Sequence, residues 1–264
     1  MLKVLKSGFY TTLQDQGRFG HRDKGVPVAG AMDGLAYAKA NHLLENSKDA
    51  AVLEITMTGP KVEFEEPTYI VLTGAAMAVA LNEQPLKTYK VYKVEAGDIL
   101  TYGRLESGLR SYLAIKNGFQ SEQILGSRSY SKAITKDTSV KANAAIPYEP
   151  CTHFEPKISE LKIDPYFDET VLEVAKGPEY GILDDIHLEK LFGANFSVAK
   201  ENNRMAYQLE EKIKGHEVSM LTSATLPGTV QMTPDGKIIV LMKDGQTTGG
   251  YPRILQLTDQ AIAI

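Results

Sequence analysis

Short apolar runs separated by turn residues dominate the hydrophobic pattern of this 264-residue chain. Each run is rich in β-branched or aromatic residues and is bounded by Gly, Pro, Asp or Asn, which is typical of β-strands. The expected strands are KVLKSG, VLEITM, KVEFEE, TYIVLTG, DILTYG, LRSYLAI, TVQMTP and KIIVLMK. The pattern therefore predicts a mainly β protein.

Two segments instead show the period of a helix. Residues 33–46 begin with an Asp suited to an N-cap and carry apolar residues along one side. Residues 184–193 show a similar apolar side and end on Gly193. Many strands with one or two helices in each half favour β-barrel domains, because a βαβ sheet needs more helices.

An internal repeat organises the chain. The segment LKVLKSGFYTTLQD at 2–15 aligns with LEVAKGPEYGILDD at 172–185, an offset of 170 residues. GAMDGLAYAKANHLL lies opposite NNRMAYQLEEKI, and TMTGPKVEFEEPTYIVLTG lies opposite TSATLPGTVQMTPDGKIIVLMKDG, in the same order and at similar offsets. A repeat this long indicates two related domains that arose by duplication, and not a solenoid.

The repeat predicts an N-terminal domain at 1–125, a linker or arm at 126–169 and a C-terminal domain at 170–264. The middle segment is polar, contains prolines and has no sustained periodicity. The second copy has no counterpart to 96–118. Either the second domain is smaller, or its last strands are missing.

Composition excludes several classes of protein. The net charge is −4 and the pI is near 5.8 without basic blocks, so we expect no nucleic-acid partner. The single cysteine, Cys151, suits a reducing compartment. The longest apolar run, at 69–81, is shorter than the ~20 residues of a membrane span. Since the N-terminus also lacks the apolar core of a signal peptide, we expect a cytoplasmic protein without a membrane partner.

Two regions carry more polar residues and glycines than packing requires. In the first, residues 12–33, the side chains of Gln14, Asp15 and Arg18 offer donors and acceptors for a small polar ligand. Long loops in compact domains are often functional, although a plain surface loop would have a similar composition.

The second region follows the strand KIIVL. Its polar residues and glycines are Asp244, Gln246, Thr247, Thr248, Gly249 and Gly250. The GQTTGG run could form a nest of backbone N–H groups for a carboxylate or phosphate, or it could be a hairpin turn. Arg204, just before a locally helical pattern, could pair with a substrate carboxylate or simply be solvated.

Other catalytic templates are absent from the sequence. It contains no G-x-x-x-x-G-K-[ST] loop for nucleotide phosphates and no G-x-S-x-G nucleophile elbow. The five histidines show neither H-x-H nor H-x-x-x-H spacing, so we expect no metal site.

Several motifs resemble the biotin-dependent carboxyltransferase / allophanate hydrolase subunit 2 family. They are TLQDQGRFGHRDKGVPVAGAMD, AVLEITMTGP, ILGSRS, NRMAYQLE and LPGTVQMTPDGKIIVLMKDGQTTGGYPRI. The resemblance covers nearly the whole chain. Two departures are a missing glycine-rich stretch after GSRS and a missing C-terminal PGD-x-x-x-F strand.

The resemblance implies two tandem cyclophilin-like β-barrels. Because bacterial family members include a component of 5-oxoprolinases, it also implies a hydrolase that opens 5-oxo-L-proline to L-glutamate, active only with the partner subunits A and B. ATP would be used by that assembly, and no biotin would be attached to this chain. Asp244 and Gln246 would be catalytic. The residues that would bind a lactam or amide substrate are Gln14, Asp15, Arg18, Arg204, Thr247, Thr248, Gly249 and Gly250. Two alternatives stay open: a carboxyltransferase component of a urea carboxylase system, and a regulatory antagonist that binds an inhibitor of a histidine kinase.

Overall fold

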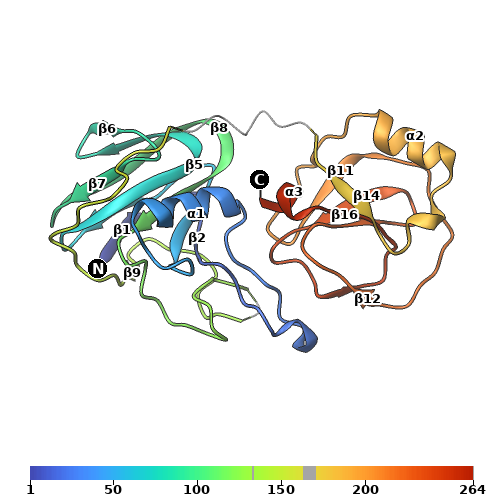
Figure 1. Cartoon of the computed structure of the whole chain (residues 1–264), viewed down its shortest axis with the longest axis horizontal. Coiled ribbons are helices and arrows are strands. Elements are labelled where there is room, and N and C mark those ends of the chain that lie inside the picture. Colours follow the sequence, from blue (N-terminus) through green and yellow to red (C-terminus); the bar gives the residue numbers. More distant parts are fainter. Residues whose placement is uncertain (133, 163–170, 264) are drawn as a thin grey trace. The chain divides into compact units, whose positions relative to one another are not determined.

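The computed structural model describes residues 1–132, 134–162 and 171–263, and the chain divides into two compact units (Figure 1). Unit 1 comprises Met1–Arg18 and Ala29–Asp168, and unit 2 comprises Phe19–Val28 and Glu169–Ile264. The domain boundary that the sequence places between 169 and 170 lies outside the described residues.

Unit 1 is built on a strongly twisted antiparallel sheet, which has nine strands among the described residues. The strands are β1 (Leu2–Lys6), β2 (Tyr10–Gln14), β3 (Val52–Thr56), β4 (Lys61–Phe64), β5 (Thr68–Leu81), β6 (Gln84–Leu86), β7 (Val91–Val94), β8 (Ile99–Ile115) and β9 (Ala145–Ile146). The main order is β2-β3-β8-β4-β1-β9, and β5 pairs with β6, β7 and β8. The runs expected to be strands in this half are all extended, but DILTYG and LRSYLAI, predicted as two strands, form the single strand β8.

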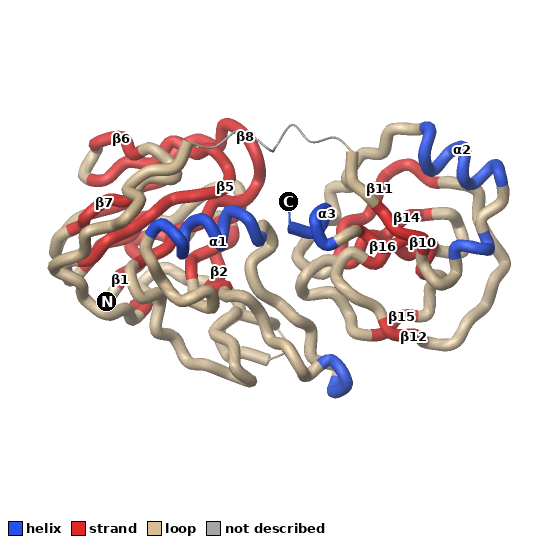
Figure 2. The backbone as a smooth tube through the Cα atoms, viewed as in Figure 1, coloured by secondary structure: helices blue, strands red, loops and turns tan. Residues whose placement is uncertain are grey.

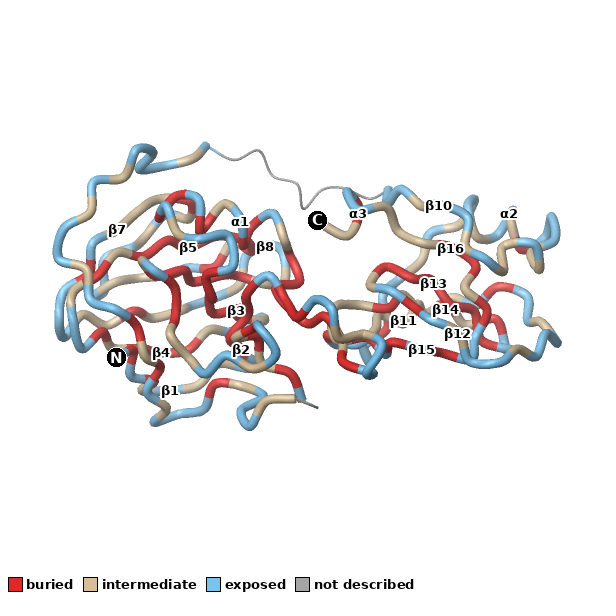
Figure 3. The backbone as a smooth tube through the Cα atoms, turned by 60° about the horizontal axis from the view of Figure 1, so that its bottom comes forward, coloured by how far each residue is buried: buried red, intermediate tan, exposed pale blue. Residues whose placement is uncertain are grey.

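The long strands β5 and β8 form the centre of unit 1. They pair antiparallel from Ile70 opposite Ile115 to Leu81 opposite Leu100, with shifts of register near Gly74 and Ala76. Such bulges bend a long strand pair, so β8 can pair with β3 near one end and with β4 near the other. Figure 3 shows buried residues along these strands, where aliphatic side chains from both faces form the core.

Helix α1 (Gly34–Leu43) covers one face of this sheet (Figure 1). Its buried side chains, which include Tyr37 and Leu43, pack against residues of β3, β5 and β8. The carboxylate of Asp33 accepts a hydrogen bond from the backbone N–H of Ala36, as the N-cap prediction requires. Helix and cap are therefore confirmed.

The segment after Leu125 belongs to unit 1 and packs against strands β1 and β2. The backbone N–H of Tyr130 donates to the carbonyl of Leu13, and that of Val140 donates to the carbonyl of Thr11. The short strand β9 then pairs with β1. These contacts place much of the predicted linker against β1 and β2, and the domain limits of 1–125, 126–169 and 170–264 stay a proposal.

Unit 2 contains a smaller antiparallel sheet in the order β10-β16-β13-β14-β11. Its strands are β10 (Val174–Lys176), β11 (Ala206–Lys212), β13 (Thr229–Met232), β14 (Lys237–Leu241) and β16 (Arg253–Leu257). A separate two-stranded sheet joins β12 (Ser223–Ala224) to β15 (Thr248–Gly249). Figure 2 shows that long loops connect these short strands.

The helical elements of unit 2 are short. They are η1 (Arg22–Lys24), η2 (Tyr180–Ile182), α2 (Asp185–Gly193) and α3 (Asp259–Ala263). Helix α2, predicted from the sequence, starts with a capping box between Asp184 and His187. No helix in the described ranges is both long and apolar enough to span a membrane.

One sequence prediction is wrong. The segment after Arg204 is not helical but forms strand β11, in which Ala206 lies opposite Leu241 of β14. Pairing with β14 satisfies its backbone hydrogen bonds and outweighs the weak local helical pattern. The segment aligned with it in the repeat, 30–44, contains helix α1. In the two outer blocks β1 aligns with β10 and β5 aligns with β14, although β2 aligns with the short helix η2. The middle block does not correspond in secondary structure.

Candidate functional site

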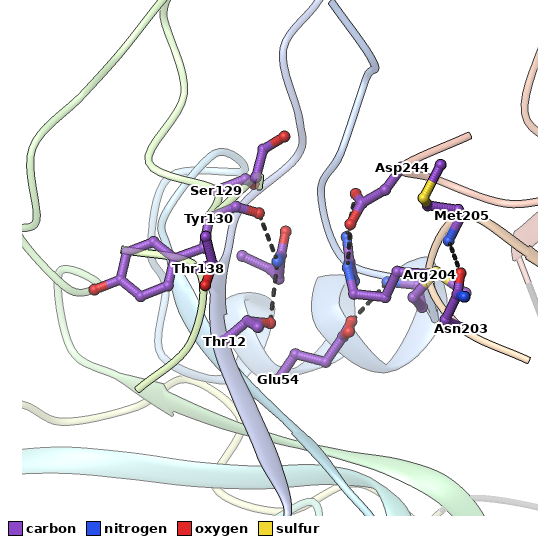
Figure 4. Close-up of polar contacts among 12 residues, drawn as sticks. Thr12, Glu54, Ser129, Tyr130, Thr138, Asn203, Arg204, Met205 and Asp244 are labelled. Carbon is purple, nitrogen blue, oxygen red and sulfur yellow. Dashed lines mark hydrogen bonds and ion pairs between the residues drawn. The ribbon is translucent and has the colours of Figure 1, made fainter. Parts of the chain in front are cut away.

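The polar segment after β14 begins with a turn that brings Asp244 against Arg204. The backbone N–H of Asp244 donates to the carbonyl of Arg204 at 2.8 Å. Nε and Nη2 of Arg204 donate to the two carboxylate oxygens of Asp244 at 2.9 and 3.0 Å (Figure 4). The side chains are 5% and 17% exposed, respectively. Both oxygens of Asp244 are thus engaged by one guanidinium, which fixes the plane and direction of that group.

Two glutamine side chains meet at Gly249. A Cβ at this position would lie 2.6 Å from Nε2 of Gln246 and 2.7 Å from Nε2 of Gln231. Gln246 is exposed, whereas Gln231 is buried and donates from Nε2 to the carbonyl of Tyr251 at 3.2 Å. The φ of Gly249 is not positive, so the backbone conformation does not require glycine here. What favours glycine is the close approach of the two side chains. The pair places two carboxamides, each able to donate and to accept hydrogen bonds, beside one stretch of backbone.

Thr225 holds the start of this segment. Its backbone N–H donates to the carbonyl of Thr247 at 3.0 Å, and its Oγ1 donates to the carbonyl of Gln246 at 2.5 Å. Further along, Thr248 and Gly249 form strand β15, paired with β12. Extended backbone at these two residues does not form the concave nest that the sequence suggested as one alternative. Recognition by this segment would therefore rely on side chains and strand-edge groups.

In unit 1, the buried carboxylate of Asp15 is a hub of hydrogen bonds. Oδ1 accepts from the hydroxyls of Ser127 and Ser129 at 2.7 and 2.6 Å and from the backbone N–H of Gly17 at 2.8 Å. Oδ2 accepts from the backbone N–H of Arg128 at 2.5 Å. The carboxylate of Asp15 thus ties the GSRS motif to the end of β2.

Arg18 and Gln14 belong to the same buried region. Nε of Arg18 donates to the carbonyl of Ile124 at 3.0 Å, and Nη2 donates to the carbonyl of Ser129. Nε2 of Gln14 donates to Oγ1 of Thr12 at 3.0 Å and to the carbonyl of Tyr130 at 3.3 Å; Figure 4 shows both of these partners. Its Oε1 is buried without a hydrogen-bond partner among the described residues. These contacts give the three residues structural partners, and their proposed contact with substrate stays a prediction.

A second buried carboxylate, Glu54, was not singled out in the sequence. Its Oε2 accepts hydrogen bonds from the hydroxyl of Tyr112 at 2.9 Å and from the backbone N–H of Met32 at 2.8 Å. Its Oε1 lies 3.7 Å from Nε of Arg110, with which it forms an ion pair. Burial and the negative charges of Glu54 and Asp33 raise the pKa of Tyr112, which therefore stays a neutral donor. The available signal was a glutamate in the middle of the apolar strand VLEIT.

The structure thus sorts the predicted site residues into two groups. Unit 1 brings together Gln14, Asp15 and Arg18; unit 2 brings together Arg204, Asp244, Gln246, Thr247, Thr248, Gly249 and Gly250. Gln231 and Thr225 are further members of the second group, missed because their place beside it depends on pairing across the sheet. In the described part of the chain, no three His, Cys, Asp or Glu side chains are grouped as metal ligands would be.

Comparison with known proteins places this arrangement in a family. The family model described as "Carboxyltransferase domain, subdomain A and B" matches residues 24–264. The chain belongs to this carboxyltransferase domain family. It is 34% identical over 260 residues to the C subunit of 5-oxoprolinase from Escherichia coli strain K12, an alignment that covers 96% of this chain and 83% of the relative.

More distant relatives include larger proteins. A urea amidolyase of Lachancea kluyveri is 30% identical over 94% of this chain, which corresponds to only 15% of that protein. The solved structure of the K. lactis urea amidolyase superposes with a TM-score of 0.90 at 25% identity, over 99% of this chain and 18% of that one. The crystal structure of TTHA0988 matches with a TM-score of 0.88 at 22% identity, and this chain spans about half (53%) of its length. These structures confirm the mainly β fold.

Proposed function

We propose that this chain is the C subunit of an ATP-dependent 5-oxoprolinase, which opens 5-oxo-L-proline to L-glutamate together with subunits A and B. The observation that carries the proposal is the pair of carboxamides, those of Gln246 and Gln231, which meet at Gly249. They lie beside the segment that begins at Asp244, whose carboxylate orients the guanidinium of Arg204. A lactam presents one N–H donor and one carbonyl acceptor. A carboxamide offers the complementary acceptor and donor within a few ångströms, so it can match both at once.

Each residue of the unit 2 group has a definite task in this proposal. Gln246, exposed at the strand end, would contact the lactam directly. Gln231 would support it, since its own amide is held by the carbonyl of Tyr251. Asp244 would act by fixing the guanidinium of Arg204, because both its oxygens are already engaged. Thr247, Thr248 and Gly250 would line the same segment.

ATP is a substrate of the proposed complex: its hydrolysis drives cleavage of the ring C–N bond. We assign no residue of this chain to the nucleotide, and no biotin attachment. The two cyclophilin-like barrels and their origin by duplication are also part of the proposal. They are supported by two pairs of aligned strands in the outer blocks of the repeat, β1 with β10 and β5 with β14.

Sequence identity favours this function over the main alternative. The chain is 34% and 30% identical to two C subunits of 5-oxoprolinases, and 30% and 28% identical to two urea amidolyases. A carboxyltransferase that works with a separate biotin carrier is the second candidate, favoured by the family itself and by the TM-score of 0.90 to the urea amidolyase.

The test is glutamate release from 5-oxo-L-proline and ATP. The chain is assayed alone, with subunits A and B, and with each of them singly. We expect glutamate only in the three-component mixture. A stable complex that releases no glutamate, but carboxylates urea when supplied with a carboxylated biotin carrier, would overturn the proposal in favour of the carboxyltransferase.

A further inference from the structure

Unit 2 contains three arginines, and two of them are neutralised by carboxylates. Arg204 is paired with Asp244 as described above, and Arg253 donates to both oxygens of Glu179 at 2.8 and 2.9 Å. Arg22 makes no ion pair with any carboxylate in the described ranges. Its charge therefore lacks an acidic partner among the described residues of this unit.

The guanidinium of Arg22 is also incompletely hydrogen-bonded. Nη2 donates to the carbonyl of Thr225, whereas Nη1 is buried and has no hydrogen-bond partner in the described chain. The side chain of Arg22 is partly buried, and this burial lowers the pKa of the guanidinium. A cation that is desolvated without a counter-charge costs free energy, and an anionic ligand would relieve that cost.

Arg22 lies next to the segment already identified as the candidate site. It belongs to the short helix η1, in the stretch Phe19–Val28 that packs with unit 2. Its partner Thr225 is the residue that bonds to the carbonyls of Gln246 and Thr247. One residue, Thr225, therefore links the guanidinium of Arg22 to the backbone of Gln246, whose carboxamide we propose to contact the lactam.

We infer that Arg22 binds the carboxylate of a small substrate whose amide or lactam group contacts Gln246. A guanidinium suits this task because its coplanar N–H groups match the two oxygens of a carboxylate. The identity of the substrate as 5-oxo-L-proline rests on the proposed function. The ligand class, a small molecule with a carboxylate close to an amide, rests on Arg22 and the strand end alone.

Kinetics of the complex of all three proteins provide the first test. Arg22→Gln removes the charge, Arg22→Lys keeps it without the planar fork, and Lys24→Gln is a matched loss of one exposed charge on the same short helix. We expect Arg22→Gln to raise KM for 5-oxo-L-proline by about 10- to 100-fold with a smaller change in kcat, and Arg22→Lys to recover part of the loss. Lys24→Gln should match the wild type. An unchanged KM in a folded Arg22→Gln complex would overturn the inference.

A binding experiment on the full chain separates this inference from the proposed function. The arginine side-chain N–H signals are followed by NMR while 5-oxo-L-proline, or 2-pyrrolidinone as the lactam without a carboxylate, is added. We expect the Arg22 signal to move with 5-oxo-L-proline and not with 2-pyrrolidinone. An equal response to both compounds, or none to either, would overturn the inference. If the wild-type complex releases no glutamate, the proposed function fails, and this titration still decides whether Arg22 binds a carboxylate.

Discussion

Arg204 and Asp244 are joined twice, once through their side chains and once through their main chains. The guanidinium donates two hydrogen bonds to the carboxylate, and the backbone N–H of Asp244 donates to the carbonyl of Arg204. The two residues are 40 positions apart, so this contact fixes the entry to β11 against the exit from β14. The polar segment 244–250 starts from this fixed point.

Asp244→Asn should destabilise unit 2, because it removes the carboxylate that accepts two hydrogen bonds from the buried guanidinium of Arg204. We expect a loss of roughly 2–4 kcal/mol in the free energy of unfolding, somewhat below the range for a fully enclosed pair, since Asp244 is 17% exposed. Urea denaturation measures the change. Asp23→Asn, which alters an exposed carboxylate, is the matched control and should stay within about 0.5 kcal/mol. Equal stability of the two variants would contradict the structural role of the pair.

Asp15→Asn should loosen the GSRS segment. The amide group of the new Asn would place N–H donors opposite the hydroxyl and backbone N–H donors that now bind the carboxylate. We therefore expect the free energy of unfolding of unit 1 to fall by roughly 2–4 kcal/mol. Hydrogen exchange at the Arg128 amide should become faster than in the wild type. The exposed Asp49→Asn variant controls for loss of charge alone. Unchanged protection of the Arg128 amide would show that Asp15 does not hold this segment.

Gly249→Ala should impair turnover more than stability. The added methyl would meet the Nε2 atoms of Gln246 and Gln231 and displace both carboxamides, which are the ends of flexible side chains. In the reconstituted complex we expect kcat/KM for 5-oxo-L-proline to fall on the order of 10-fold or more, as displacement of positioning groups commonly causes. Gly193→Ala, at the end of α2, is the control, because nothing lies within 4 Å of a Cβ there. Similar kcat/KM values for both variants would remove the carboxamide pair from the site.

Gln246→Ala should abolish most activity of the complex while leaving folding and assembly intact. The side chain is exposed, so its truncation costs little packing. Glutamate release, thermal unfolding and copurification with the partner proteins provide the three readouts. Full turnover in this variant would place the chemistry away from the strand end.

The Glu179–Arg253 pair should make unit 2 sensitive to acid. Hydrogen bonds from Arg253 lower the pKa of Glu179 below its ordinary value of 4.5. Its contribution to stability is therefore complete above that value and is lost as the pH falls through the lower pKa of the folded state. We expect Glu179→Gln to reduce stability at neutral pH and to flatten its dependence on pH below about 4.5. Urea midpoints at several pH values measure this, with the exposed Glu189→Gln as control. An unchanged slope in Glu179→Gln would contradict the role of the pair.

The local pattern of the sequence was sufficient for most of the secondary structure. Short β-branched and aromatic runs predicted β1, β3, β4, β5, β8, β13 and β14, and the cap at Asp33 marked the start of α1. An apolar side ending at Gly193 predicted α2, because all these signals depend on neighbouring residues only. The same reasoning failed at Ala206–Lys212. A weak helical period there was overruled by pairing with β14, which is distant in sequence.

The candidate site shows the same division. The sequence by itself marked Asp244–Gly250 as unusually polar for the end of a strand. It also predicted that Arg204 and Asp15 bind a small polar ligand. Only the tertiary structure showed that Arg204 is held by Asp244, that Gln231 meets Gln246 at Gly249, and that Arg22 reaches Thr225 without an acidic partner among the described residues. These relations join residues 15 to 203 positions apart, and the way the chain packs decides them, because no local pattern records which distant side chains will meet.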